Sequence, residues 1–210
     1  MIVGIIVDGQ GEVQALPLLL VRIGSPHTIL QPVLSDVQPL APLAQIALRV
    51  AKRVRLLHAK GAERIVLLLD RESRNGCPGA LASALSVLIA DRAGLPADVI
   101  LVVIKDRTFE NWLIADPDAL RSCSGLFEPS HRFERHIAPD RADHVEALGL
   151  LKAWTAKGQS YHKIKAACAI CSRLAPLTAA ANSRSFRRFL RTIDVPPYTE
   201  QSRLPAQPGQ

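Results

Sequence analysis

Pairs of acidic residues follow three apolar runs in this sequence, where they could bind a cation. The runs end near residues 7, 69 and 104. The acids are, in chain order, Asp8 with Glu12, Asp70 with Glu72, and Glu110 with Asp116. Clustered carboxylates raise one another's pKa unless a cation neutralises them. Oxygen ligands of this kind select hard ions, so we expect Mg²⁺ or Mn²⁺ as the cofactor.

Each acid also has a purely structural explanation. Asp8 and Asp70 could cap the helix or turn that follows them. Glu12 and Glu72 could be first-turn acids favoured by the helix dipole. Asp116 precedes a proline, a pattern typical of a helix N-cap. Taken singly, each acid favours the structural explanation. Taken together they favour a shared site, because capping does not require acids after every strand.

The apolar patterns predict a parallel α/β sheet that would position these acids. Strands are predicted at 2–7, 28–34, 64–69 and 98–104, the second being a weaker edge strand because it contains Pro32. Helices are predicted between them, at 12–23, 40–59 and 80–93. Ligands of such sheets bind beyond the carboxyl ends of the strands, which is where the acids would lie.

The chain is predicted to change character after the last strand. Helices are expected at 109–115, 143–156, 161–174 and 183–193, with a polar loop at 124–140 and a proline-rich tail from 195. We therefore divide the chain into an α/β core at 1–122, a basic helical extension at 123–194 and a flexible tail at 195–210. This order of elements indicates about four strands, flanked by helices.

Positive charge is concentrated in the last third of the chain. Residues 151–210 carry ten Lys or Arg and two acids, whereas residues 1–150 carry 16 basic and 17 acidic residues. A basic segment beside an acidic site favours a polyanion such as DNA or RNA as partner. The alternative is a solvated helical face that only maintains solubility.

Several other classes of protein are disfavoured by the sequence. The chain shows no secretory signal pattern and no apolar run near the ~20 residues that span a bilayer. Its four cysteines suit a reducing compartment, so we expect a cytoplasmic location and no membrane partner. Cys168 and Cys171 form a lone Cys-x-x-Cys that favours buried thiols over a zinc site. Dinucleotide and P-loop fingerprints are absent, so we expect neither NAD binding nor ATP hydrolysis.

Four segments, in order, resemble Toprim domains. Residues 7–12 (Val-Asp-Gly-Gln-Gly-Glu) are similar to the opening Toprim motif, and 67–72 (Leu-Leu-Leu-Asp-Arg-Glu) to its Asp-x-Asp strand end. Residues 109–116 look like a Glu-x-Trp-Leu-x-x-Asp segment, and 161–163 with 185–189 look like a C-terminal pattern. The resemblance covers most of residues 1–193. It is strongest to small Toprim-like bacterial proteins of unknown function (domain of unknown function family 4276), related to the Toprim domain of OLD-type nucleases.

This resemblance implies a Rossmann-like, Toprim-type fold and a metal-dependent nuclease. Asp8, Glu12, Asp70 and Glu72 would hold one or two Mg²⁺ or Mn²⁺ ions, and Glu110 and Asp116 would complete the metal site. Lys163 would place a cation near the scissile phosphate, although it could equally be a surface lysine. A nucleic-acid backbone would lie along the arginines of the last predicted helix, namely Arg184, Arg187, Arg188 and Arg191. Asp8 and Glu72 depart from the usual Glu and Asp, which changes the reach of each carboxylate.

Alternative functions remain open. The resemblance also implies a possible role in bacterial defence against phage, with a separate ATPase protein as partner. A second possibility is a non-catalytic subunit that binds nucleic acid or nucleotide through a degenerate site. A third is a receiver-like protein phosphorylated at Asp70, which the neighbouring Glu72 and the helical C-terminal half disfavour.

Overall fold

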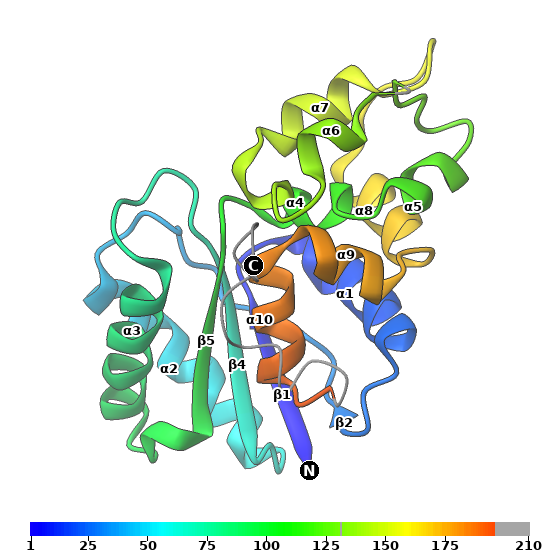
Figure 1. Ribbon diagram of the computed structural model, residues 1–210. Helices are drawn as coiled ribbons and strands as arrows, with labels where there is room; N and C mark the ends of the chain where they lie inside the picture. The colour runs from blue at the N-terminus through cyan, green and yellow to red at the C-terminus, as the bar shows by residue number, and fades with distance from the viewer. Residues whose placement is uncertain (131, 196–210) are drawn as a thin grey trace, which may run out of the picture.

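The computed structural model describes residues 1–130 and 132–195 and shows an α/β fold built on a parallel sheet (Figure 1). The strands are β1 (Ile2–Val7), β2 (Thr28–Ile29), β3 (Val33–Leu34), β4 (Arg64–Asp70) and β5 (Ile100–Lys105). Their order is β2-β1-β4-β5, β3 also pairs with β1, and every pairing is parallel. The predicted Rossmann-like class is confirmed. The tail predicted from residue 195 lies outside the described residues, apart from Val195 itself.

The weak edge strand predicted at 28–34 is divided into two short strands. β2 pairs with the start of β1 and β3 with its end, so both extend the same side of the sheet. Pro32 lies between them, and a proline has no N–H with which to continue a ladder of hydrogen bonds. The backbone nevertheless stays close to β1, because Leu30 N donates to Val3 O at 2.9 Å.

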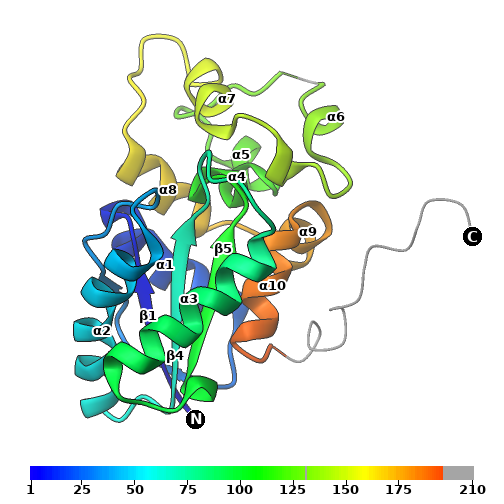
Figure 2. The same ribbon diagram turned by 90° about the vertical axis from the view of Figure 1, so that its left-hand side faces the viewer.

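Helices cover both faces of the sheet, and the alternation of side chains along the strands explains why. On one face, α2 (Leu43–Ala59) and α3 (Pro78–Ala93) pack against strand residues such as Ile65 and Leu67. On the other, α1 (Gln10–Ile23) and α10 (Arg184–Thr192) cover Val66 and Leu68. Figures 1 and 2 show these two layers on opposite sides of β1, β4 and β5. Every central strand is therefore buried on both faces.

The segment between β5 and α10 forms a helical roof, by which we mean residues 109–182. Figure 1 shows much of it beyond the carboxyl ends of β4 and β5. The described residues also contain two short 3₁₀ helices, one at Ala97–Val99 before β5 and one at Ala142–His144 inside the roof. The α-helices of the roof are α4 (Phe109–Ile114), α5 (Pro117–Ser122), α6 (Glu134–Ile137), α7 (Ala147–Ala153), α8 (Lys163–Cys171) and α9 (Pro176–Asn182).

One expectation for this half of the chain needs revision. The segment 124–140, predicted as a loop, contains the short helix α6. The polar pattern of this segment does not predict the helix, which depends on contacts in the core. Phe133 and Ile137 are four residues apart, so they lie on one helix face, and both are fully buried. Within the segment predicted as a helical extension, α10 shares one hydrophobic cluster with strand residues such as Val66.

The described residues contain no single helix that is long and apolar enough to cross a membrane. α8 and α9 satisfy that test only when taken together, and they meet at a bend of 113°. Both helices contribute buried side chains to the cluster that also contains α1.

The strand order predicts where a ligand would bind at this sheet. The chain leaves β1 toward the β2 and β3 side, and later returns to add β4 and β5 on the opposite side. In open α/β sheets, the crevice for ligands opens at such a reversal, beyond the carboxyl ends of the two strands. Here those ends carry Asp8 and Asp70, directly after β1 and at the last residue of β4.

Candidate functional site: four charged side chains at the strand ends

Asp8 joins the ends of the two central strands. Its Oδ2 atom accepts a hydrogen bond from the backbone N–H of Asp70 at 2.7 Å. β1 and β4 are neighbours in register up to Ile6 and Leu67, so this bond continues their pairing beyond the ladder. The carboxylate of Asp8 is thereby held in one orientation beside that of Asp70, as the positions of both residues at strand ends predicted.

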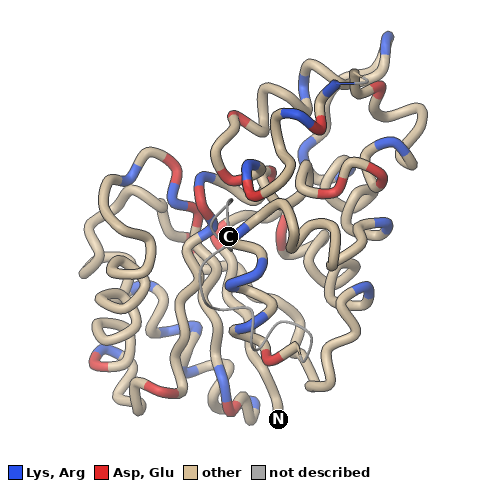
Figure 3. The backbone as a smooth tube through the Cα atoms, in the orientation of Figure 1, with Lys and Arg blue, Asp and Glu red and all other residues tan. Residues whose placement is uncertain are grey.

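Lys105 lies at the centre of the acidic cluster and is fully buried. It is the last residue of β5 and is paired in register with Asp70. Its Nζ atom lies 2.8 Å from Asp8 Oδ1 and 2.9 Å from Asp70 Oδ1, and it also forms an ion pair with Glu12. Figure 3 shows acidic segments gathered at this end of the strands. One ammonium therefore binds three carboxylates that come from different parts of the chain.

Glu12 is held from the opposite side by the start of α1. Its Oε2 atom accepts a hydrogen bond from the backbone N–H of Gly9 at 3.0 Å, while Oε1 faces Lys105. Glu12 is therefore both a first-turn acid that caps its helix and a member of the charged cluster. The structural and functional explanations of this residue are not exclusive.

Burial and the neighbouring charges shift the pKa values of the three acids in different directions. Burial raises the pKa of Glu12 well above its usual value, and the charges of Asp8 and Asp70 act in the same direction. Burial also raises the pKa of Asp70, to about 6, although Lys105 partly opposes it. For Asp8, the effect of burial is outweighed by Lys105 and by hydrogen bonds from Glu12 and the Asp70 backbone, so its pKa is lowered. The cluster therefore has more negative charge than Lys105 alone neutralises.

A second ion pair lies beside this cluster. Glu110, in the first turn of α4, is almost fully buried, and its Oε1 atom lies 2.9 Å from Nζ of Lys163, the first residue of α8. The Glu110 charge contributes to the raised pKa of Asp70. Although burial lowers the pKa of Lys163, Glu110, Asp70 and Glu12 together raise it. Asp8, Glu12, Asp70, Glu110 and Lys163, predicted from distant segments, are thus brought together.

Asp70 and Glu110 accept few hydrogen bonds within the described chain. Oδ1 of Asp70 and Oε1 of Glu110 are buried without a well-directed hydrogen bond and each lies beside a lysine ammonium, and Oδ2 of Asp70 and Oε2 of Glu110 accept no hydrogen bond from any described residue. Within residues 1–130 and 132–195, no three His, Cys, Asp or Glu side chains are arranged to hold a metal by themselves. Asp8 and Glu12 are instead directed to Lys105.

Two predicted metal ligands are placed differently. Both oxygens of Asp116 accept backbone hydrogen bonds, Oδ1 from Asp118 and Ala119 in the first turn of α5 and Oδ2 from Ala175 at 2.6 Å. Asp116 is thus an N-cap that ties α5 to the start of α9. Glu72 is exposed, and its backbone has a φ of 51°. Its side chain forms no ion pair within the described residues, so neither acid shares the contacts of the central cluster.

The predicted nucleic-acid-binding arginines do not form a uniform surface. Arg187 is half-buried, and its guanidinium lies 2.6 Å from Asp140 Oδ1, so it ties α10 to the roof. Arg184, Arg188 and Arg191 are exposed on α10. The predicted thiols also differ. Cys171 is buried and Cys168 is half-buried, and both are free.

Lys105 is not among the predicted site residues, because the prediction rests on acids that follow the strands. The sequence does carry a signal, since a lone lysine ends the apolar run that continues through Ile104. A lysine at the carboxyl end of a central strand lies at the same edge as Asp8 and Asp70. A basic residue there can act as the counter-ion of the acids. Several acids at one edge of a sheet need such a counter-ion, so their number is a signal for it.

We predict that Lys105→Met destabilises the protein in a pH-dependent manner. Removing one partner of a buried ion pair typically costs about 3–5 kcal/mol. Without Lys105, the pKa values of Glu12 and Asp70 in the folded state rise further above their unfolded values, and the lysine charge that lowers the pKa of Asp8 is lost. The folded state then binds protons more tightly than the unfolded state, so the loss in the free energy of unfolding is largest at pH 8 and smaller at pH 5. Urea unfolding at both pH values measures this loss.

Lys163→Met is the matched comparison: the lysine is half-exposed, although its loss leaves the buried Glu110 without a partner, so we expect a smaller loss of stability than for Lys105→Met, whose ammonium is fully buried among three carboxylates. Adding Glu12→Gln to the Lys105→Met chain should restore part of the lost stability at pH 8. An equal loss at pH 5 and pH 8 would contradict the account of Lys105 as the counter-ion of the cluster.

The family of this chain was identified from its sequence. A family model described as "Domain of unknown function (DUF4276)" matches residues 7–194, a span that runs from the end of β1 to beyond the end of α10 and includes every residue of the charged cluster. No curated protein and no solved structure matches the chain. Since the matched span is most of its length, the chain belongs to the DUF4276 family.

Proposed function

We propose that this protein hydrolyses phosphodiesters of nucleic acid with the help of a bound Mg²⁺ or Mn²⁺ ion. The observation that carries the proposal is the charge of the site. Four buried or half-buried carboxylates, Asp8, Glu12, Asp70 and Glu110, face two lysines, Lys105 and Lys163. When all six are ionised the group has a net charge of −2, from four negative and two positive groups. A divalent cation would balance it.

Asp70 and Glu110 are the residues that we assign to the cation. Each has one carboxylate oxygen that is not engaged by the described residues, and these are hard oxygen donors. Mg²⁺ commonly binds proteins through only one or two carboxylates, keeps several waters and takes further ligands from substrate phosphates. The lack of a three-residue cage among the described residues is therefore compatible with this assignment. Bound there, the cation would activate water and stabilise charge on the phosphodiester oxygens.

The remaining residues of the cluster have supporting tasks in this proposal. Lys105 neutralises Asp8 and Glu12 and binds the Oδ1 atom of Asp70, so that the Oδ2 atom of Asp70 is left for the cation. Asp8 fixes the end of β4 through its bond to the Asp70 N–H. Lys163 is half-exposed and can exchange Glu110 for a substrate phosphate, as a compact ammonium does in many phosphate sites. The chain thus holds its metal ligands rigidly and keeps one mobile cation for the substrate.

The resemblance to Toprim domains supports the same reaction. The segments that carry it contribute Asp8 and Glu12, Asp70, and Glu110, which are the acids of the cluster. We extend the proposal to a relationship with the Toprim domain of OLD-type nucleases, to cooperation with a separate ATPase protein and to a role in phage defence. These extensions are supported by the resemblance alone.

Lys105 itself favours a second candidate function. An ammonium at the centre of three carboxylates occupies the position that a metal ion would take in an all-acid site, and it satisfies Asp8 and Glu12 without one. The protein would then be a non-catalytic subunit that binds nucleic acid or nucleotide. The two candidates differ in whether Asp70 and Glu110 bind a divalent cation.

We predict that Asp70→Asn and Glu110→Gln each reduce cleavage of plasmid and single-stranded DNA or RNA by at least about 100-fold, because even partners of metal ligands cost 10–100-fold when removed. Cleavage is measured in the presence of Mn²⁺ and, as a blank, with EDTA. Asp118→Asn is the matched control, because this side chain is 89% exposed and outside the cluster, and it should leave the rate unchanged. Wild-type protein that neither binds Mn²⁺ nor cleaves any of these substrates would favour the binding subunit instead.

Exposed arginines of α10 are predicted to contribute to nucleic-acid affinity. Replacing Arg184, Arg188 and Arg191 with alanine should weaken binding and lower the salt dependence of the binding constant by about one unit of slope for each lost phosphate contact. The control replaces Lys52 and Arg55, which are exposed on α2, and Lys60, the exposed residue that follows α2; this helix lies across the sheet from α10. Fluorescence anisotropy over a range of salt concentrations measures both slopes. Equal slopes in the two triple variants would exclude α10 as the binding surface.

A further inference from the structure

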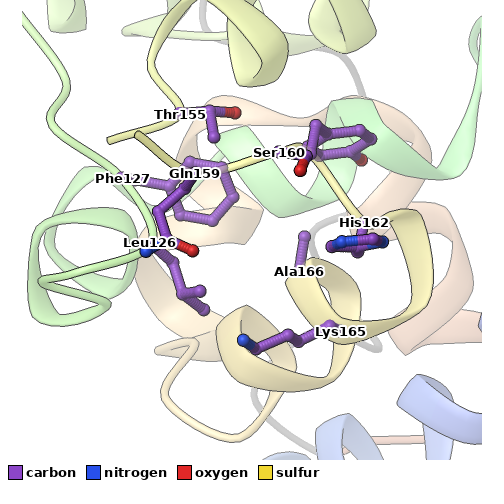
Figure 4. A pocket seen from close by; sticks show the side chains of 9 residues that line it. Leu126, Phe127, Thr155, Gln159, Ser160, His162, Lys165 and Ala166 are labelled. Atoms are coloured by element: carbon purple, nitrogen blue, oxygen red, sulfur yellow. The ribbon is translucent and has the colours of Figure 1, made fainter. Parts of the chain in front are cut away.

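The outer face of the α2 layer, rather than the helical roof, offers room for a partner. In the roof, the pocket beside the start of α8 has space for about one water molecule, and Phe127 and Ala166 in its wall are almost fully buried (Figure 4). On the α2 side, by contrast, Leu48 of α2 and Val87 of α3 are 63% and 59% exposed, and Leu56 of α2 is 42% exposed. No step of the proposed hydrolysis uses these side chains.

The two exposed leucines belong to a row of side chains along α2. Leu48, Lys52 and Leu56 are four residues apart, so they lie on one side of the helix. The row is about 12 Å long, because an α-helix rises 1.5 Å per residue. α3 packs beside α2, and a hydrogen bond of 2.9 Å from Arg55 to the backbone oxygen of Arg92 joins the two helices. The row therefore lies beside the exposed face of α3.

The stretch that contains α2 is strongly basic. Residues 37–62 carry no Asp or Glu and five Lys or Arg, namely Arg49, Lys52, Arg53, Arg55 and Lys60. Within the described residues, none of the five forms an ion pair. Lys52 lies between the two leucines, and the exposed Arg49 and Arg55 lie three residues before and after it. A basic face that also exposes leucines is complementary to a partner that is both acidic and apolar.

The arginines of α2 are held in place by the protein itself. Arg49 donates a hydrogen bond to the backbone oxygen of Asp36 at 3.2 Å. Arg53 donates one to the backbone oxygen of Leu34 at 3.0 Å. Each of these bonds uses one N–H group of a guanidinium that has five, so the others can still bind a carboxylate. Because less freedom is lost when a fixed guanidinium binds, this arrangement suits the fixed carboxylates of a folded segment rather than the mobile headgroups of a lipid surface.

We propose that the outer face of α2 binds an acidic amphipathic helix of another protein. The leucines would contact apolar residues two turns apart on that helix, and its carboxylates would pair with Arg49, Lys52 and Arg55. A nucleic-acid backbone would leave the leucines exposed, and a second copy of this chain would place the same cations against them. The face lies across the sheet from α10, so the inference goes beyond the proposed hydrolysis and does not depend on it.

The inference is tested with the full chain and a synthetic probe. The probe is a labelled peptide of about 18 residues, or five helical turns, made of Leu, Ala and Glu, with a stripe of leucines flanked by glutamates. A matched peptide has lysine in place of every glutamate. Fluorescence anisotropy measures the affinity for both. We expect the acidic peptide to bind at least about tenfold more tightly than the basic one, because like charges across an interface repel.

Charge reversal on α2 gives a readout that a loss of structure would not give. Lys52→Glu with Arg55→Glu should weaken binding of the acidic peptide at least about tenfold and strengthen binding of the basic peptide. The control is Lys152→Glu with Lys157→Glu, which reverses two exposed charges of the helical roof. It should leave both affinities unchanged.

The contribution of the leucines is measured in the same assay. Leu48→Ser with Leu56→Ser should weaken binding of the acidic peptide at least about fivefold, because apolar anchors supply much of the affinity of a helix in a groove. Leu18→Ser with Val21→Ser is the matched control, since these side chains of α1 are 38% and 80% exposed. This control should bind the peptide as the wild type does.

Equal affinity for the two peptides, unchanged affinity in either α2 variant, or no binding of the acidic peptide would overturn the inference. The same variants would then identify another occupant. If the face binds lipid, Leu48→Ser with Leu56→Ser would reduce binding to phosphatidylglycerol vesicles, and if it binds a second copy, this variant would dissociate a dimer in sedimentation. A lower salt slope of nucleic-acid binding after Lys52→Glu with Arg55→Glu would assign the face to nucleic acid.

Discussion

The ion pairs of Lys105 are the interaction on which the rest of the site depends. Transfer of three carboxylates into the end of a buried sheet is unfavourable, because each loses its hydration. The three can be ionised at this position only because an ammonium lies within contact of all of them. Since the residues belong to β1, α1, β4 and β5 or follow them directly, the same charge also fixes how these elements end relative to one another.

The consequence for function lies in what Lys105 leaves unbalanced. Its single positive charge is opposed by three negative ones, and the raised pKa values of Glu12 and Asp70 show that protonation competes to remove the excess. A divalent cation can replace those protons, and the oxygens of Asp70 and Glu110 that have no described partner are available for it. The helical roof adds two further members of the site, because it contributes Glu110 and Lys163.

The sequence predicts the parts of this arrangement that depend on local pattern. The apolar, β-branched run at 2–7 is typical of a strand buried on both faces, and the rule that ligands bind at carboxyl ends of parallel strands then brings Asp8 and Asp70 together. Glu12 follows because it lies one turn into the next helix. In each case, spacing along the chain determines position in space.

Other features depend on contacts between distant segments and were not predictable in the same way. Asp116 resembles a metal ligand until Ala175, 59 residues away, is seen to occupy its second oxygen. Arg187 has the pattern of a phosphate-binding residue, but its partner is Asp140 from the roof. The short helix α6 is stabilised by burial of Phe133 against Trp154 rather than by its own sequence pattern. Lys105 differs, since its position at a strand end was visible in the sequence.

The central claim is that the charged cluster accepts a divalent cation between Asp70 and Glu110. Anomalous scattering from a crystal of the wild-type protein grown with Mn²⁺ tests it most directly, because the peak locates the metal without reference to activity. The account predicts one peak within coordination distance of Asp70 Oδ2 and Glu110 Oε2, with Lys105 still bound to Asp8 and Glu12. A map with no peak at this position, at a Mn²⁺ concentration that saturates other Mn²⁺-dependent enzymes, would contradict it.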